Sequence, residues 1–309
     1  MASLAIIIPA YKIDFFEDTL KSLAAQTCKD FTVYIGDDCS PNDFKSLVDK
    51  YVDEIDIVYH RFADNLGGKD LVGHWSRCVA LTKDEPWLWL FSDDDVMDKH
   101  CVESFYRENK DYDLYHFNVN VIDSTGIVIR KVKPFPTLTS SEAFYKAKVG
   151  SEVESFVVEY IFSRRSYEEI GGFVHFNMAW GSDIATWVSI GEKKGIKTIS
   201  DSVIFWRQSD KNITPDHNNE MVLKKTMVDV DCFKWANTFF NSSSIQRYNI
   251  YGLFRNMVYY SDVLSNAQEQ QVLKYAKEKG IIRHGFVQFI KLCYPLFRVY
   301  KKIKSLNVN

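Results

Sequence analysis

The sequence lacks several features, and each absence excludes a class of protein. The six cysteines include no Cys-x-x-Cys pair, so neither a zinc site nor a disulfide framework is indicated, and a reducing cytosol fits best. No stretch approaches the roughly 18 consecutive apolar residues of a membrane span, and the start has no basic region or cleavage signal, so we expect no export. A net charge of -3 disfavours general binding to nucleic acid.

What the sequence does contain is an alternation of apolar runs and helical spacings over its first third. Short runs rich in β-branched or aromatic residues predict strands over 4–9, 31–35, 55–59 and 87–91, with one helix between each pair. Strands joined in this way lie parallel with right-handed crossovers, so their carboxyl ends share one edge of the sheet. That edge brings together Tyr11, Asp37, Asp38 and Asp93–Asp95, and it is where open α/β sheets bind ligands.

Beyond residue 112 the pattern changes. Residues 114–122 and 127–132 predict a hairpin, which makes the sheet mixed. A capping box from Thr139 to Glu142 predicts a helix start, and a later helix is expected to run from Trp180 to Gly195. From about residue 216 only helical patterns occur. We therefore expect a Rossmann-like α/β domain over 1–215, with a mixed, mainly parallel sheet, and a helical region over 216–309.

Three consecutive aspartates follow the fourth predicted strand. Ionised neighbours raise one another's pKa, and a bound cation relieves that repulsion. Oxygen ligands without cysteine or histidine favour Mg²⁺ or Mn²⁺, with a diphosphate supplying the remaining ligands. The alternative is that Asp94 and Asp95 only end the strand and cap the next helix. Asp37 and Asp38 could likewise form only a turn, or could accept hydrogen bonds from a base or ribose beside the aromatic ring of Tyr11.

These residues and their order resemble family 2 glycosyltransferases of the GT-A fold. The resemblance covers roughly residues 3–214 and rests on the segments IIIPAYK at 6–12, QTCKDFTVYIGDDCS at 26–40, NLGG at 65–68, LFSDDD at 90–95, IGGF at 170–173, WGSD at 180–183 and WRQSDKNIT at 206–214. It implies that the nucleotide of a sugar donor is embraced by the residues after the first two strands, namely Pro9, Ala10, Tyr11, Asp37 and Asp38. Asp38 is the residue expected to contact the base.

The resemblance also implies a metal site. The family motif reads Asp-x-Asp-Asp, and Ser92 stands in place of its first aspartate. Asp94 then corresponds to the metal-binding position, with Asp95 or the donor-side Asp93 assisting. Arg77 is expected to reach the donor, although the family's Ala-Arg-Asn segment is altered around it to Trp75-Ser76-Arg77-Cys78.

Further along the chain, the resemblance places Arg207 near the diphosphate. Gln208 and Ser209 stand where many relatives have a metal-binding histidine, and His217 is a weak substitute. Asp183 corresponds to the general base on the acceptor side, while Ser182 replaces the preceding glutamate. Without the resemblance, Asp183 is equally consistent with a helix N-cap. Glu152, Glu154 and Glu159 are the next candidates for the base.

The last segment, residues 281–304, is basic and aromatic with no acidic residue. It suits either an anionic membrane interface or a helix packed on the protein. We expect a Mn²⁺- or Mg²⁺-dependent inverting transferase that moves a sugar to a glycan or lipid-linked glycan at the cytoplasmic side of a membrane. The resemblance implies a UDP-sugar as its donor. The alternatives are a catalytically silent sugar-nucleotide or glycan-binding protein and a nucleotidyltransferase.

Overall fold

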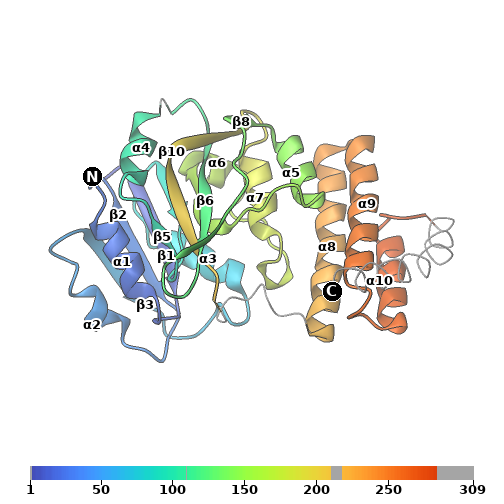
Figure 1. Cartoon of the computed structure of the whole chain (residues 1–309), viewed down its shortest axis with the longest axis horizontal. Helices are drawn as coiled ribbons and strands as arrows, with labels where there is room; N and C mark the ends of the chain where they lie inside the picture. The colour runs from blue at the N-terminus through green and yellow to red at the C-terminus, as the bar shows by residue number, and fades with distance from the viewer. Residues whose placement is uncertain (1, 109, 210–217, 284–309) are drawn as a thin grey trace. The chain divides into compact units, whose positions relative to one another are not determined.

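The computed structural model describes residues 2–108, 110–209 and 218–283. The chain divides into two compact units, Met1–Lys211 and Asn212–Asn309, close to the boundary expected at 215/216. The strands of the first unit, shown in Figure 1, are β1 Leu4–Ala10, β2 Thr32–Asp37, β3 Asp56–Arg61, β4 Trp87–Leu90, β5 Val96–Met97, β6 Leu114–Ile122, β7 Val128–Lys131, β8 Leu138–Thr139, β9 Tyr160–Ser163 and β10 Ile196–Arg207. Its helices are α1 Phe16–Ala24, α2 Phe44–Val48, α3 Leu71–Val79, α4 Cys101–Arg107, α5 Ser141–Val149, η1 Val157–Glu159, α6 Arg164–Glu169, η2 Asn177–Ala179 and α7 Ser182–Ile190.

One mixed sheet organises the first unit. Its strand order is β3-β2-β1-β4-β9-β6-β10-β5, with β7 paired to β6 and β8 to β10. Strands β3, β2, β1 and β4 run parallel, as the β-α-β alternation predicts, whereas β9 is antiparallel to both β4 and β6. The hairpin expected after residue 112 is the antiparallel pair β6 and β7. The predicted mixed, mainly parallel architecture is therefore confirmed.

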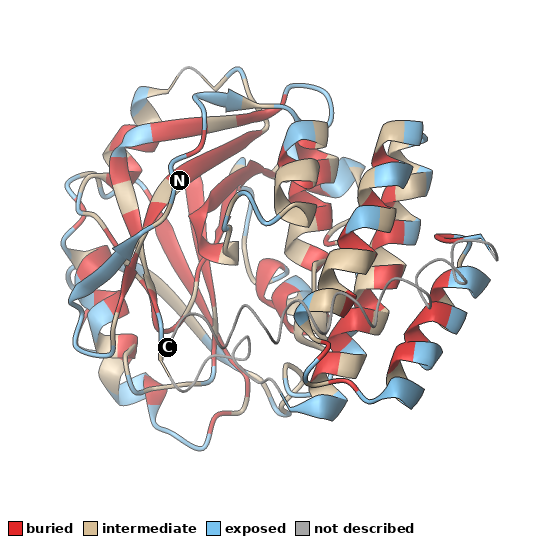
Figure 2. Ribbon diagram, turned by 45° about the vertical axis from the view of Figure 1, so that its right-hand side comes forward, coloured by how far each residue is buried: buried red, intermediate tan, exposed pale blue. Residues whose placement is uncertain are grey.

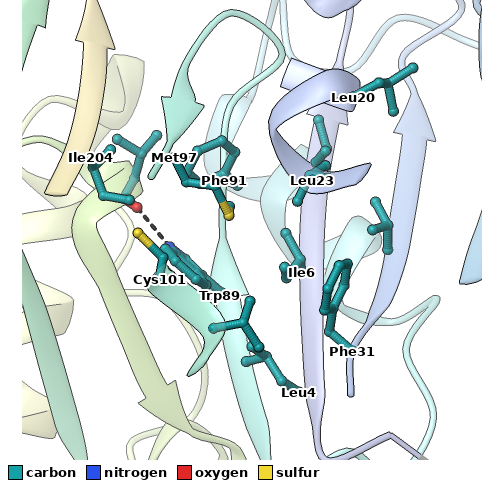
Figure 3. Close-up of a cluster of buried hydrophobic side chains, with 14 of the residues drawn as sticks. Leu4, Ile6, Leu20, Leu23, Phe31, Trp89, Phe91, Met97, Cys101 and Ile204 are labelled. Carbon is teal, nitrogen blue, oxygen red and sulfur yellow. Dashed lines mark hydrogen bonds between the residues drawn. The ribbon is translucent and has the colours of Figure 1, made fainter. Parts of the chain in front are cut away.

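The sheet is buried because helices cover its faces. Even-numbered residues of β1, Leu4, Ile6 and Ile8, pack in one apolar cluster with Phe16 of α1 and Phe44 of α2. Successive strand residues point to opposite faces, so this cluster forms one side of the sheet. Figure 3 shows part of it around Trp89, whose indole Nε1 donates to the Val158 carbonyl at 2.7 Å. Buried residues accordingly concentrate on the strands in Figure 2.

Two helix limits differ from those expected. The N-cap of α5 is Ser140 and not Thr139, because the Ser140 hydroxyl accepts from the Ala143 amide at 3.2 Å. Helix α7 ends at Ile190, five residues before the expected Gly195. Gly195 has a left-handed φ of +81° and instead leads the chain into β10.

The second unit is described over residues 218–283 and contains helices only in that range. These are α8 Asn219–Phe240, α9 Ser243–Tyr259 and α10 Asn266–Glu278. Buried apolar residues of all three helices, such as Val230, Leu253 and Leu273, form its interior. Over the described residues, no helix is long and apolar enough to cross a membrane. His217 and nearly all of the basic segment 281–304 lie outside the described residues, so the two readings of that segment stay open.

Candidate active site

The loops that follow β1, β2 and β4 meet at the carboxyl edge of the sheet. The Asp93 carboxylate accepts from the backbone amides of Tyr11 at 2.8 Å and Lys12 at 2.7 Å. The Asp38 amide donates to the Ala10 carbonyl at 2.9 Å, and the Ser40 hydroxyl donates to the Tyr11 carbonyl. The structure thus joins the three loops that sequence patterns placed together. Tyr11 is 44% exposed, so its ring is free to stack on a ligand.

Pro9 and Ala10, the last two residues of β1, are less accessible to a ligand than Tyr11. Ala10 is fully buried, and its carbonyl already accepts from Asp38. Pro9 is partly buried and lies opposite Gly36 of β2. The nucleotide contacts expected of these two residues stay predictions, and for Ala10 the burial favours a role in shaping the loop.

Asp37 is a buried anchor at the end of β2. Its carboxylate accepts from the Tyr59 hydroxyl at 2.6 Å, from the Arg61 guanidinium at 2.7 Å and from the Ser40 amide at 2.8 Å. The last contact is the turn that the alternative reading predicts. Burial and the neighbouring Asp37 raise the pKa of the Tyr59 phenol to about 12. Asp37 therefore holds the loop, and its side chain has little capacity left for a ligand.

Asp38 fixes the glycine-containing loop that precedes α3. Its two oxygens accept from the amides of Leu66 at 2.9 Å and Gly67 at 2.8 Å, and the Arg77 guanidinium also binds one of them. A Cβ at Gly67 would lie 2.8 Å from Asp38 Oδ2, closer than carbon and oxygen can pack. The glycine thus permits the close approach that this carboxylate requires.

The guanidinium group of Arg77 donates its hydrogen bonds to other residues of the chain. Besides Asp38, it donates to His74 Nδ1 at 3.0 Å and to both the side chain and the carbonyl of Asp64, and it stacks 3.9 Å from the Phe62 ring centre. His74 accepts this bond as a neutral imidazole, and burial lowers its pKa to about 4. The contact with the donor expected of Arg77 stays a prediction, and these partners favour a role in holding Asp38.

The three aspartates after β4 are buried but are held differently. Asp93 accepts the two amides described above, and Asp95 accepts from the Arg207 amide at 2.7 Å. Burial raises the pKa of Asp93 to about 6, with Lys12 opposing and Asp94 adding to that rise, and burial raises the pKa of Asp95 as well. Asp94 instead contacts two side chains, the Ser92 hydroxyl and the Lys12 ammonium.

These contacts limit how a divalent cation fits. Over the described residues, no three His, Cys, Asp or Glu side chains form a group arranged for a metal. Asp95, expected as a ligand, is 1% exposed and tied to the backbone, and Asp93 is tied in the same way. Asp94 remains, with oxygen chemistry that suits Mg²⁺ or Mn²⁺. One carboxylate would bind such a cation weakly by itself, and substrate phosphates would complete the coordination, as is common for Mg²⁺.

Arg207 lies behind the aspartate loop. Its guanidinium donates to the Asp94 carbonyl at 2.8 Å, to Asp18 of α1 at 3.0 Å and to the carbonyls of Asp123 and Ser124 in the turn before β7. The residue is 1% exposed. A contact with the diphosphate stays a prediction, and the structure favours a role in supporting the loop.

Asp183 lies in the first turn of α7 and does not cap it. The N-cap is Gly181, at a left-handed φ of +79°, and no side chain caps the helix there. The hydroxyl of Ser182 accepts from the Phe176 amide at 2.9 Å. Burial raises the pKa of Asp183, and Glu159 adds to the rise while Lys148 opposes it. Asp183 is therefore not the N-cap residue, but its carboxylate still hydrogen-bonds to first-turn amides of α7, and its role as a base stays a prediction.

The other candidate bases have distinct environments. Glu154 forms a bidentate pair with Arg130 on β7 at 2.6 and 2.7 Å and is exposed. Glu159 is fully buried, with its carboxylate 3.3 Å from His116 Nε2. Neither Glu159 oxygen has a hydrogen-bond partner among the described residues, so the contact with His116 is not a hydrogen bond. Glu154 is thus paired at the surface and Glu159 is enclosed, so neither environment favours it over Asp183 as the base.

With this geometry established, residues 5–171 match the family model described as Glycosyl transferase family 2, which is more than half of the chain. The chain belongs to this family. It is 27% identical over 154 residues, 47% of its length, to the poly(ribitol-phosphate) beta-N-acetylglucosaminyltransferase TarS of Staphylococcus aureus. The matched part is 26% of that relative, so the chain spans about a quarter of the curated protein's length.

Solved structures agree on the fold of this family 2 glycosyltransferase. S. aureus TarS 1–349 in complex with UDP superposes with a TM-score of 0.55 at 14% identity, covering 91% of this chain and 88% of that one. TarS 1–349 in complex with UDP-GlcNAc gives a TM-score of 0.54 at 15% identity. GalNAc-T7 with UDP, GalNAc and Mn²⁺ gives 0.50 at 9% identity over 74% of this chain and 47% of that one. These likenesses show the GT-A type of fold.

Sequence reasoning missed one prominent residue of the site in this family 2 enzyme. Lys12 follows Tyr11 directly and lies beside Asp93 and Asp94. Burial alone would lower the pKa of Lys12, but Asp93 and Asp94 outweigh it and raise the value. The available signal was a lysine at the carboxyl end of a buried strand, one loop away from three aspartates. Asp183 and Arg207 lie beyond the matched residues 5–171, so their roles are proposals.

Proposed function

We propose that this enzyme is a metal-dependent inverting glycosyltransferase. It moves a sugar from a UDP-sugar to a glycan or lipid-linked glycan acceptor during synthesis of a surface polysaccharide, at the cytoplasmic face of a membrane. The observation that carries the proposal is the meeting of exposed Tyr11 with the buried carboxylates of Asp38 and Asp93 at one edge of the sheet. An aromatic ring beside fixed carboxylates suits a nucleoside, and Asp94 beside them suits a cation that holds a diphosphate.

On the donor side, Tyr11 stacks on the base, and Asp38 shapes the loop around it through Leu66 and Gly67. Asp94 would hold Mg²⁺ or Mn²⁺, and the cation would supply charge neutralisation for the departing diphosphate. The remaining contacts belong to the chain. Asp93 and Asp95 fix the loop through backbone amides, so Asp94 is positioned before any ligand arrives.

On the acceptor side, Asp183 acts as the general base. It takes the proton of the acceptor hydroxyl while that oxygen attacks the sugar C1 from the face opposite the nucleotide. The bond between C1 and the diphosphate oxygen breaks at the same centre, and UDP leaves with the bonding electrons. A new glycosidic bond of inverted configuration results. The raised pKa of Asp183 supports this role because it makes the carboxylate a stronger base than a free aspartate.

Relatives support the choice of donor. TarS is named as a poly(ribitol-phosphate) beta-N-acetylglucosaminyltransferase and has been crystallised with UDP and with UDP-GlcNAc. By analogy, UDP-GlcNAc is the first donor to test here, and poly(ribitol phosphate) is one acceptor to include. Because the chain spans only part of the curated relative, its own donor and acceptor are part of the proposal.

Product analysis tests the function. The full chain is incubated with UDP-sugars and an acceptor panel, with Mn²⁺ or with EDTA, and the released nucleotide is measured. Metal-dependent release of UDP together with a β-linked product from an α-linked donor is expected. Pyrophosphate release from a nucleoside triphosphate would identify a nucleotidyltransferase. Nucleotide-sugar binding without turnover on any acceptor would identify a binding protein.

A further inference from the structure

Lys12 is the cation of the aspartate loop in this structure. Its ammonium pairs with Asp94 Oδ2 and lies 3.7 Å from Asp93 Oδ1. The other oxygen of Asp94 accepts from the Ser92 hydroxyl. The lysine side chain is 31% exposed, whereas that of Asp94 is 4% exposed. Asp94, the one carboxylate suited to a metal, is thus fully partnered by side chains of the chain itself.

The two side chains that bind Asp94 can move away without a change in the backbone, whereas the groups that bind Asp93 and Asp95 cannot. Asp93 and Asp95 are bound by main-chain amides, which move only if a loop moves. Lys12 binds through an ammonium on a flexible four-carbon stem. Because the Lys12 side chain is partly exposed, its ammonium can turn toward solvent without a change in the backbone.

A lysine ammonium and a divalent cation compete for one carboxylate because like charges repel strongly at contact distance. We propose that Lys12 is an exchangeable counter-ion of Asp94, which a divalent cation must displace in order to bind. The released ammonium then pairs with the diphosphate of the donor. This inference rests on the metal-dependent function proposed above and adds a second residue to its donor site.

The proposal makes two ligands respond in opposite directions to one substitution. Lys12→Met removes the charge and keeps the apolar stem. Binding of Mn²⁺ alone should tighten roughly tenfold, since its competitor is gone. Binding of UDP at saturating Mn²⁺ should weaken roughly 3- to 10-fold, since a charged partner of the diphosphate is lost. A residue with a purely structural role would weaken both.

The experiment is titration calorimetry on the full-length chain with Mn²⁺ alone and then with UDP at saturating Mn²⁺. Lys45→Met is the matched control, because Lys45 is an exposed lysine on α2 that pairs with Asp49 and carries the same charge. It should stay within about twofold of wild type for both ligands. Lys12→Arg keeps the charge and should bind Mn²⁺ within a few-fold of wild type, and melting temperatures verify that all variants fold.

The possible results distinguish a failure of the Lys12 exchange from a failure of metal-dependent sugar transfer. Equal Mn²⁺ affinities for wild type, Lys12→Met and Lys45→Met would overturn the exchange while leaving a metal site intact. Weaker binding of both ligands by Lys12→Met would assign Lys12 a structural role. If UDP release proceeds equally in EDTA and no variant binds Mn²⁺, the metal dependence itself is wrong, and the exchange falls with it.

Discussion

The donor and acceptor sides of this enzyme hold their carboxylates in different ways. On the proposed donor side, Asp38, Asp93 and Asp95 accept from backbone amides of neighbouring segments, so each of these carboxylates fastens one segment to another, and Asp37 accepts from the Ser40 amide of its own turn. On the acceptor side, Asp183 stands in the first turn of a helix whose cap is a glycine. The carboxylates on the proposed donor side therefore mainly hold loops together, whereas Asp183, the proposed base, joins no two loops.

This difference teaches how to read clustered acidic residues. Several aspartates in one site need not all bind the ligand, because the oxygens of a buried carboxylate that accepts backbone amides already have hydrogen-bond partners. Asp94 differs from these aspartates because its two partners, Ser92 and Lys12, are side chains. The proposed chemistry therefore rests on Asp94, with Tyr11 and Lys12 beside it, and on Asp183 as the proposed base.

The sharpest test of the comparison is Asp183→Asn. Asparagine keeps the size but cannot take a proton, so turnover should fall by roughly 10²- to 10⁴-fold while donor affinity stays near wild type. Because Gly181 caps α7, the melting temperature should change little. Single-turnover rates at saturating donor and acceptor measure the loss, with Glu154→Gln as the control. A variant that transfers sugar within a few-fold of wild type would remove Asp183 from the mechanism.

Asp94→Asn should act on the other side of the site. We expect affinity for a UDP-sugar in the presence of Mn²⁺ to fall by roughly 10- to 100-fold, with the fold nearly intact because like-charge repulsion in the loop is relieved. Calorimetry with and without Mn²⁺ measures the effect. Unchanged affinity in Mn²⁺ would show that Asp94 is not the metal ligand.

The pH profile distinguishes the base from the loop carboxylates. The raised pKa of Asp183 means that the base becomes protonated at a higher pH than a free aspartate would. Turnover at saturating substrates should thus be constant above that pKa and fall about tenfold per pH unit below it. Turnover rates measured between pH 4 and 8 test for this fall, and circular dichroism at each pH verifies that the protein stays folded. Persistence of the fall in Asp183→Asn would assign the titration to another group.

The smallest effect is expected for Arg77→Met, which tests whether Arg77 holds Asp38 in place or contacts the donor. Arg77→Met leaves buried Asp38 without its cation, so we expect a loss of about 2 kcal/mol and a melting temperature lower by about 4–8 °C. Arg165→Met, at an exposed arginine paired with Glu169, should leave the melting temperature nearly unchanged. If Arg77 contacts the donor instead, UDP affinity will drop with no comparable change in melting temperature.

The sequence predicts much of this fold because its signals there are local. Apolar runs mark β1, β2, β3 and β4, and the chain order of strand and helix determines that their carboxyl ends converge. The same reasoning placed Tyr11 beside Asp93 correctly. It erred at the start of α5, where Thr139 and Ser140 are equally good caps and tertiary packing chooses between them.

Side-chain partners were less predictable, because they join residues far apart in the chain. Arg77 meets Asp38 across 39 positions, and Arg207 meets Asp18 across 189. No periodicity or motif encodes such a pair. The sequence predicted donor contacts for both arginines, whereas the structure shows their guanidinium groups bonded to protein atoms.

The position of β10 has a consequence for synthesis of the protein. This strand lies between β6 and β5, and its last residue, Arg207, binds the loop that carries Asp94 and Asp95. A nascent chain that ends before residue 196 already contains every donor-side aspartate, yet β6 has an open edge and β5 has no neighbour. Open edges invite pairing with other chains. The residues up to Arg207 must therefore leave the ribosome before the donor loops can close, and until then the open edge of β6 can pair with other chains.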